Sequence, residues 1–494
     1  MISGLFAVVI TMGLHLIGAP SDDWLTFRGP AASGSSQEAE LPVSWGAEEN
    51  IAWHTEIPGR GWSSPIVVGN KVFVTTAVEL PAEKSEEPEA EEEEEPSPAE
   101  RLARGGRGGR GGRGGFGGRG QQGPPDTPHR FQIYCLDRET GKVLWNQVAL
   151  EDKPRIPTHR SNTYASETPV SDGQHVYAYF GMTGLYCYDL DGKLVWKKDL
   201  GVYPMQGGWG TSSSPALHGD HVFIQVDNNE SSFLVALDKK TGDEKWRVSR
   251  KEGSTWGSPV IWKNEKRTEL VAPGSQQVIS YDPATGKVLW ELGIGGGQCS
   301  STPSISNGLL FFGTSGGGGR RGGGGRRPNA APQDENQEEG GRGGRGGGGG
   351  GGTLFAVKAG ASGDITPTGE EGSEGLAWAA EGAGPQMASP VVAGGYVYVL
   401  SQRGGIIQCL DVKTGKLVYR KRLPDAAAFW ASPYTYGGKV FCPDDAGKTF
   451  VIEPGPELKI VATNTIEDQF WASAAISQGT VFLRGTEGGI YAIR

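Results

Sequence analysis

The amino-acid sequence predicts an all-β fold, a single eight-bladed β-propeller of four-stranded antiparallel blades that is closed by an N-terminal strand. Two repeated phrases support this prediction. The first, "LDRETGKVLW" at 136–145, recurs along the chain, and the second, which contains Ser-Pro or Thr-Pro, precedes each of its copies. In the middle of the chain the second phrase returns about every 44 residues, which is the length of a four-stranded propeller blade.

The number of blades follows from the second phrase, which occurs eight times, once as a degenerate Ser-Ala form. Its copies lie at 61–74, 165–180, 212–226, 256–262, 300–313, 387–400, 430–442 and 471–485. The first phrase returns at 237–246, 281–290 and 410–419, and in shortened form at 188–196. Units of this length are too long for leucine-rich repeats and predict propeller blades.

Each unit divides into four strands, A to D. Strand A follows the Ser/Thr-Pro, and a short Gly-containing turn leads to strand B, such as "YVYVL" at 396–400. Strand C is "IIQCLD" at 406–411 in the same unit, and the Thr-Gly-Lys turn leads to strand D. Apolar and polar residues alternate in B and C, and the turns carry Gly, Asn and Asp where positive φ is needed.

The first phrase is explained as a hairpin followed by a wedge between blades. Its Asp accepts hydrogen bonds from backbone amides across the turn, its Gly permits the turn, and its Trp fills the gap to the neighbouring blade. The residues with this structural role are Asp137, Gly141, Trp145, Trp196, Asp238, Gly242, Trp246, Asp282, Gly286, Trp290, Asp411 and Gly415. Catalysis is not needed to explain their recurrence.

The chain ends predict export and ring closure. Residues 1–20 contain an apolar run too short for a comfortable membrane span, and we interpret them as a signal peptide, with an uncleaved anchor as the alternative. A lead-in at 21–48 precedes the propeller at 49–494. The eighth unit stops after strand C at Arg494, so we expect "ENIAWHTEI" at 49–57 to supply its missing strand. A periplasmic or secreted monomer with no transmembrane segment after signal removal is expected.

Two low-complexity insertions interrupt the repeats. Residues 79–129 in blade 1 are Glu-rich and then Arg/Gly-rich, and residues 315–352 in blade 5 are Gly/Arg-rich. Neither segment has enough apolar residues to order itself, so both are predicted to be disordered. Both fall between strands B and C, which places them at the end of the propeller where strand D passes to the next strand A.

The cysteines do not indicate thiol chemistry. Of the five, Cys135, Cys187 and Cys409 occupy one repeat position, where other units carry Ala or Ser. Such a position requires a small buried side chain. The chain has no Cys-x-x-Cys and no His-x-x-x-His, and we assign no catalytic residue and no metal ligand.

These repeats resemble the pyrroloquinoline-quinone-like (PQQ-like) β-propeller family. The resemblance rests on the pattern small-x-Asp-x-x-Thr-Gly-Lys-x-x-Trp at 135–145, 236–246, 280–290 and 409–419, with Asp243 for Lys and Tyr419 for Trp in one copy each. The opening "DWLTFRGP" at 23–30 is similar to the N-terminal phrase of exported members from planctomycete-type bacteria. The family contains quinoprotein dehydrogenases and non-enzymatic members such as the outer-membrane assembly lipoprotein, an eight-bladed scaffold.

The resemblance implies two alternative functions. Quinoprotein alcohol dehydrogenases hold PQQ between a Trp and a ring formed by two adjacent cysteines, with Ca²⁺ bound by Glu, Asn and Asp, and this chain has no Cys-Cys pair. We therefore expect a non-catalytic exported propeller, a protein- or glycan-interaction scaffold in the cell envelope that needs no cofactor. The alternative is a PQQ- and Ca-dependent quinoprotein oxidoreductase acting on an alcohol or a sugar.

A ring of aromatic residues marks the predicted channel mouth. Each of four tryptophans sits three residues before the Pro or Ala that opens strand A, while Trp209, His159 and Arg160 reach the same rim. The four are Trp62, Trp256, Trp430 and Trp471. The favoured interpretation is that they pack between blades near the axis. The alternative is an aromatic-lined mouth that binds a peptide, a glycan or a quinone-like ring.

The Arg/Gly segments raise the question of nucleic acid, because such segments bind it by charge and stacking. Export and a formal net charge of −10 argue against that partner, since the protein as a whole has no basic field. A solvated linker is the simpler interpretation, and binding to a polyanionic envelope glycan is the alternative.

Overall fold

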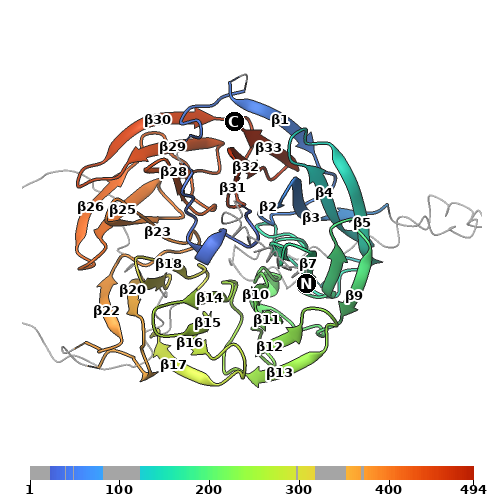
Figure 1. Ribbon diagram of the computed structural model, residues 1–494, viewed down its shortest axis with the longest axis horizontal. Coiled ribbons are helices and arrows are strands. Elements are labelled where there is room, and N and C mark those ends of the chain that lie inside the picture. The colour runs from blue at the N-terminus through green and yellow to red at the C-terminus, as the bar shows by residue number, and fades with distance from the viewer. Residues whose placement is uncertain are drawn as a thin grey trace, which may run out of the picture.

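The computed structural model describes residues 23–38, 40–47, 49–81, 123–295, 299–316, 352–368 and 372–494. Eight antiparallel sheets are arranged like blades around a central axis, as Figure 1 shows. The only helices in these ranges are two short 3-10 turns, η1 (Pro30–Ala32) and η2 (Gln206–Gly208). The predicted fold class, an all-β eight-bladed propeller, is confirmed.

Within blades 1 to 7 the strands follow one another outward from the axis in sequence order (Figure 1). Blades 1 to 4 are formed by β2 (Ile66–Val68), β3 (Lys71–Glu79), β4 (His129–Asp137) and β5 (Val143–Asp152); β6 (Val170–Ser171), β7 (His175–Phe180), β8 (Gly184–Asp189) and β9 (Leu194–Lys198); β10 (Ala216–His218), β11 (His221–Val226), β12 (Phe233–Asp238) and β13 (Glu244–Ser249); and β14 (Val260–Lys263), β15 (Thr268–Ala272), β16 (Gln277–Tyr281) and β17 (Val288–Gly293).

Blades 5 to 7 continue the same order. They are formed by β18 (Ser304–Ser306), β19 (Leu309–Gly313), β20 (Thr353–Lys358) and β22 (Leu376–Glu381); β23 (Val391–Ala393), β24 (Tyr396–Leu400), β25 (Ile406–Asp411) and β26 (Leu417–Arg422); and β27 (Tyr434–Tyr436), β28 (Lys439–Pro443), β29 (Lys448–Glu453) and β30 (Lys459–Thr465). The two insertions lie between β3 and β4 and between β19 and β20, and residues 82–122 and 317–351 of them are outside the described residues, as is the predicted signal peptide.

Blade 8 is completed by the N-terminal region, as predicted. It contains β31 (Ala475–Ser477), β32 (Thr480–Arg484) and β33 (Gly489–Ile493), and β1 (Ile51–Glu56) supplies the outermost strand. β1 runs antiparallel to β33, with Trp53 opposite Ala492. Ring closure therefore joins the two ends of the chain in one sheet and covers what would otherwise be an exposed edge.

Blade 4 differs from the four-stranded expectation because it has a fifth strand. β21 (Gly363–Asp364) pairs in parallel with β17, through Trp290 and Gly363. β21 belongs to the connection between β20 and β22 of blade 5, which lacks a Thr-Gly-Lys turn. Without that tight turn, the longer connection reaches back to the outer edge of the preceding blade.

The repeated Trp and Gly form one interlocking contact between successive blades. The indole N–H of Trp196 on β9 donates to the Lys239 carbonyl of blade 3 at 3.1 Å. Gly242 lies against this indole with φ of 76°, and a Cβ there would be 2.7 Å from Trp196 Cε3. The same arrangement joins Trp53 to Gly141, Trp145 to Gly192, Trp246 to Gly286 and Trp378 to Gly415. The glycine is thus required both by its backbone conformation and by the indole.

Trp290 is the exception among these tryptophans. Its indole N–H donates to Glu269 Oε2 of its own blade at 2.6 Å, because blade 5 presents no glycine turn to receive it. It still packs in the hydrophobic cluster shared with blade 5, which includes Ala361 and Ile365. The turn aspartates act as expected of Asx turns: Asp411 Oδ1 accepts from the Thr414 amide at 2.8 Å and from its hydroxyl at 2.7 Å.

Candidate binding site in the central channel

The lead-in, residues 23–38, crosses one end of the central channel and forms its floor. It enters at blade 1, where Trp24 and Val67 exchange backbone hydrogen bonds of 3.0 and 2.9 Å, and leaves at blade 7, where the Thr435 amide donates to Gly34 O at 2.9 Å. Between these points η1 lies at the centre of the ring, in contact with β14 and β18 (Figure 1). The lead-in lies at the end where the A–B turns are, because the Gly69 amide donates to Asp23 Oδ1.

Arg28 fastens this floor. Its side chain is buried and donates only to carbonyl oxygens. Two of them, Pro390 O at 2.7 Å and Pro433 O at 3.3 Å, belong to blades 6 and 7, and the others belong to the lead-in itself. Burial lowers the pKa of Arg28 to about 9, so the guanidinium remains charged at neutral pH. The lower end of the channel therefore holds a buried positive charge, which the dipoles of the backbone carbonyls stabilise.

Above the floor, a closed ring of eight hydrogen bonds surrounds the axis. In every blade, the Ser or Thr that precedes strand A donates its backbone N–H to the hydroxyl oxygen of the equivalent residue in the next blade, at 2.9–3.2 Å. The members of this hydroxyl ring are Ser64, Thr168, Ser214, Ser258, Thr302, Ser389, Ser432 and Ser473. The ring explains the recurring Ser/Thr, since each buried N–H at the axis needs an acceptor from the neighbouring blade.

A cavity of about 910 Å³ occupies the channel from the hydroxyl ring to the mouth. Phe27 of the lead-in, all eight members of the hydroxyl ring, and the residues expected at the rim line it. The rim residues are Trp62, His159, Arg160, Trp209, Trp256, Trp430 and Trp471. The channel is thus a cup rather than an open pore, and we refer to this cavity as the central cup.

The aromatic rim residues form two clusters that pack internally and also face the central cup. In the Trp471 cluster, from blades 7, 8 and 1, Trp471 stacks on Trp430 with centroids 4.3 Å apart and meets Trp62 at the same distance. In the Trp209 cluster, from the entries to blades 2, 3 and 4, Trp209 stacks on His159 at 4.2 Å and meets Trp256 edge-on at 6.3 Å. The same tryptophans therefore both pack between blades and line the mouth of the channel, so the geometry is compatible with both interpretations of the sequence.

Hydrogen bonds within the rim hold the Trp209 cluster in place. His159 Nδ1 lies 2.6 Å from Ser161 Oγ, and Asn162 Nδ2 donates to the carbonyls of Trp209 at 2.8 Å and Thr211 at 3.0 Å. The Trp256 indole N–H donates to Gly210 O at 2.8 Å. A rim fixed in this way does not have to be ordered by a ligand, which lowers the entropic cost of binding.

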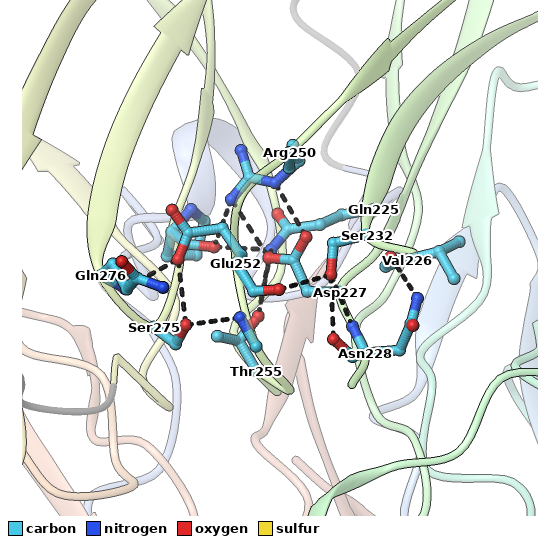
Figure 2. Close-up of polar contacts among 12 residues, drawn as sticks. Gln225, Val226, Asp227, Asn228, Ser232, Arg250, Glu252, Thr255, Ser275 and Gln276 are labelled. Carbon is cyan, nitrogen blue, oxygen red and sulfur yellow. Dashed lines mark hydrogen bonds and ion pairs between the residues drawn. The ribbon is translucent and has the colours of Figure 1, made fainter. Parts of the chain in front are cut away.

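A buried ion pair holds the segment that precedes Trp256, and Figure 2 shows its hydrogen bonds. Arg250 Nε donates to Asp227 Oδ1 at 2.8 Å, and both side chains are fully buried. The Thr255 hydroxyl donates to Asp227 Oδ2 at 2.9 Å (Figure 2). Burial lowers the pKa of Arg250, but the attraction of Asp227 outweighs it and the pKa is raised. The network ties the segment that leads to Trp256 to blade 3, a support that the sequence analysis did not identify.

The charged groups of the cup are mainly cationic. Arg160 and Arg403 line it, and neither makes an ion pair within the described ranges. Asp445 is the one acidic residue in the lining, and its Oδ1 already accepts from the Ala428 amide at 2.9 Å. The cup therefore carries more positive than negative charge, although the whole chain has a net charge of −10.

The cysteines lie apart from the cup. All five cysteines are buried and unpaired as disulfides, and burial raises their pKa, for example to about 12 in Cys299. Within the residues that the structure describes, no three His, Cys, Asp or Glu side chains are grouped so that they could hold a metal ion. Nor do these residues include a helix of the length and apolarity that a bilayer crossing requires.

Solved structures share this architecture at low sequence identity. A europium-containing methanol dehydrogenase matches with a TM-score of 0.58 and 11% identity, covering 93% of this chain and 89% of that one. The quinohemoprotein alcohol dehydrogenase from Comamonas testosteroni gives 0.56 and 12%, covering 95% and 80%. BamB from Moraxella catarrhalis gives 0.50 and 12%, covering 73% and 88%. At such identities the likeness concerns the fold alone.

Sequence comparison is more specific. A polyvinylalcohol dehydrogenase from Pseudomonas sp is 24% identical over an alignment of 206 residues, and the match covers 32% of this chain and only 30% of that protein. The family model described as outer membrane protein assembly factor BamB matches residues 129–319 and 361–494, well over half of the chain. These ranges include seven of the eight Ser/Thr-Pro phrases. The chain therefore belongs to the family of the outer membrane protein assembly factor BamB.

Proposed function

We propose that the protein is a non-catalytic, exported interaction scaffold of the cell envelope that binds a protein or glycan partner at the mouth of its central cup. The observation that carries this proposal is the cup itself: a closed floor, a hydroxyl ring locked by hydrogen bonds, and a rim of preformed aromatic clusters. Large, rigid aromatic side chains at a concave surface are typical of binding sites. Membership of the BamB family supports an envelope location and a protein partner.

The alternative, a PQQ-dependent oxidoreductase, draws support from the alcohol dehydrogenase structures that share the fold. Ca²⁺ needs six to eight oxygen ligands, usually with several carboxylates. The cup lining offers one carboxylate, Asp445, and the five cysteines are buried and separate in sequence. These residues do not fit a quinone held by Ca²⁺. The side chains of the cup are therefore better suited to bind a partner than to oxidise a substrate. No nucleic-acid partner is proposed, because the exported protein is acidic overall.

The proposal is tested with the purified chain as bait in an envelope extract. Trp209 is 39% exposed, so Trp209→Ala removes a rim aromatic at little risk to folding; Leu194→Ala on the outer strand β9 is the matched control. We expect partners to be retained by the wild type and by Leu194→Ala, and to be lost from Trp209→Ala. Retention that is equal for all three proteins would contradict binding at the cup.

A second measurement addresses the oxidoreductase. The same preparation is mixed with PQQ and Ca²⁺ and assayed for a bound chromophore and for dye reduction with alcohols and sugars. We expect neither. Reproducible turnover that depends on both additions would overturn the scaffold proposal.

A further inference from the structure

The hydroxyl ring leaves eight protons without acceptors. Each Ser or Thr oxygen accepts one backbone N–H, and none of the eight hydroxyls donates to another residue in the described part of the chain. A hydroxyl that accepts can still donate. All eight residues line the cup and are buried, with exposed fractions of, for example, 1% for Ser64 and 4% for Thr302. The lower wall of the cup is therefore a circle of donors.

The upper part of the cup adds further donors. Arg160 and Arg403 are exposed at the rim and make no ion pair with any described residue. The indole N–H groups of Trp62 and Trp471 are buried and have no acceptor among these residues. Asp445, the one acidic residue of the lining, is already hydrogen-bonded. A ligand that is rich in acceptors and carries negative charge complements these donors.

The two aromatic clusters constrain the shape of that ligand. They occupy separate arcs of the rim, blades 7, 8 and 1 for the Trp471 cluster and blades 2 to 4 for the Trp209 cluster. An indole face accepts a ring that has an apolar face and a polar edge. Because both clusters face the same cavity of about 910 Å³, a ligand of linked rings has an aromatic surface to contact on each arc.

We infer that the central cup binds an acidic oligosaccharide, a chain of two or more sugar rings that bears carboxylate groups. This inference rests on the proposed function and specifies its ligand. The ring faces stack on the indoles, the ring hydroxyls accept from the hydroxyl ring, and the carboxylates pair with Arg160 and Arg403. A peptide suits the cup less well, because its backbone N–H groups find no partner in the two arginines or in the unpaired indole N–H groups of the lining.

The test is a titration of the full chain, followed by tryptophan fluorescence and calorimetry, with hexagalacturonate as the probe. Its fully methyl-esterified form keeps the sugar chain and removes the charge, and hexaglutamate and PQQ represent an acidic peptide and a carboxylated quinone. We expect hexagalacturonate to bind, with the ester at least about tenfold weaker because charge-assisted hydrogen bonds are lost. Added salt should weaken the binding of the acid and not that of the ester.

Two variants test whether the rim residue Arg403 itself binds the carboxylates, as opposed to the overall charge of the protein. Arg403→Gln should weaken hexagalacturonate binding about tenfold and leave ester binding unchanged, and Arg420→Gln, on the exposed outer strand β26, is the matched control with no effect on either. Trp209→Ala should weaken both ligands alike. Circular dichroism confirms that each variant is folded.

Several results would overturn the inference. They are the absence of hexagalacturonate binding, equal affinity for acid and ester, no effect of Arg403→Gln, or tighter binding of hexaglutamate or PQQ. If envelope partners are still captured through Trp209 while no saccharide binds, the ligand class is wrong and the scaffold proposal stands. Dye reduction that depends on PQQ would instead contradict the scaffold proposal itself.

Discussion

The backbone N–H of Ser473 donates to the hydroxyl oxygen of Ser64 at 3.0 Å, across a sequence separation of 409 residues. This bond joins blade 8 to blade 1 and completes the hydroxyl ring. Two contacts therefore close the ring: the pairing of β1 with β33 at the outer edge, and the hydrogen bond to the Ser64 hydroxyl at the axis.

Ser64→Ala removes the acceptor and leaves the buried Ser473 N–H unpaired. We expect the free energy of unfolding to fall by about 1–3 kcal/mol. Ser64→Thr keeps the hydroxyl, as Thr168 and Thr302 do in other blades, and should retain most of the stability. Chemical denaturation measures the free energy of unfolding of both variants. An equal loss of stability in Ser64→Ala and Ser64→Thr would show that the hydroxyl does not stabilise the protein at this position.

Arg28→Met keeps an unbranched apolar stem and removes the hydrogen bonds to the blade 6 and blade 7 carbonyls. We expect the lead-in to detach more readily, so that limited proteolysis cleaves within residues 23–38 faster than in the wild type. Peptide mapping locates the cut. A cleavage pattern like that of the wild type would show that Trp24 and the backbone bonds to blades 1 and 7 are sufficient to hold the floor.

Gly242→Ala places a Cβ 2.7 Å from the Trp196 ring in a left-handed backbone conformation. We expect a loss of about 2–4 kcal/mol, the sum of strain and overpacking. Gly219 has φ of 58° but open space where a Cβ would lie, so Gly219→Ala should lose only about 1–2 kcal/mol. Thermal unfolding compares the pair. Indistinguishable losses would show that the indole contact adds nothing.

Asp227→Asn leaves the buried Arg250 without its ion-pair partner. Removing one partner of a fully buried pair destabilises by about 3–5 kcal/mol. The control is Glu244→Gln, which breaks the partly exposed Glu244–Arg247 pair and should change stability by less than about 1 kcal/mol. Because the network supports Trp256, we also expect the tryptophan fluorescence to shift for Asp227→Asn and not for Glu244→Gln. An unchanged spectrum for Asp227→Asn would show that the ion pair does not support the rim.

Glu167 predicts a specific pH dependence of stability. Burial raises its pKa from 4.5 to about 7, and the Thr211 hydroxyl counteracts this only in part. Between these values the folded state holds a proton that the unfolded state has released, so stability falls as pH rises from 4.5 to 7 and the loss is complete above pH 7. The contribution is about 3 kcal/mol.

Glu167→Gln should therefore be more stable than the wild type at pH 8 and equal to it near pH 4, with a flatter profile between. Denaturation curves across this pH range measure the effect. Glu457→Gln, at an exposed position, should follow the wild-type profile. A wild-type profile that is unchanged by Glu167→Gln would assign the pH dependence to other groups.

The sequence by itself determined the number of blades, the strand order and the closing strand. These features depend on local signals that repeat: a turn of Asp, Thr and Gly, alternating strands, and Ser/Thr-Pro before each strand A. The same phrase placed the tryptophans at the rim, where Trp62, Trp256, Trp430 and Trp471 line the central cup. A local pattern can fix local structure, and repetition then fixes the global symmetry.

Only the tertiary structure decided what happens along the axis. The lead-in does not repeat, and the bond from Arg28 to Pro433 spans 405 residues, so no spacing in the sequence indicates that it forms a floor. The Asp227–Arg250 pair likewise joins two segments, 23 residues apart, that carry no repeated phrase. A contact that occurs once leaves no periodic signal in the chain. The Ser and Thr of the hydroxyl ring do recur in the sequence, but their hydrogen bonds to the next blade are visible only in the structure.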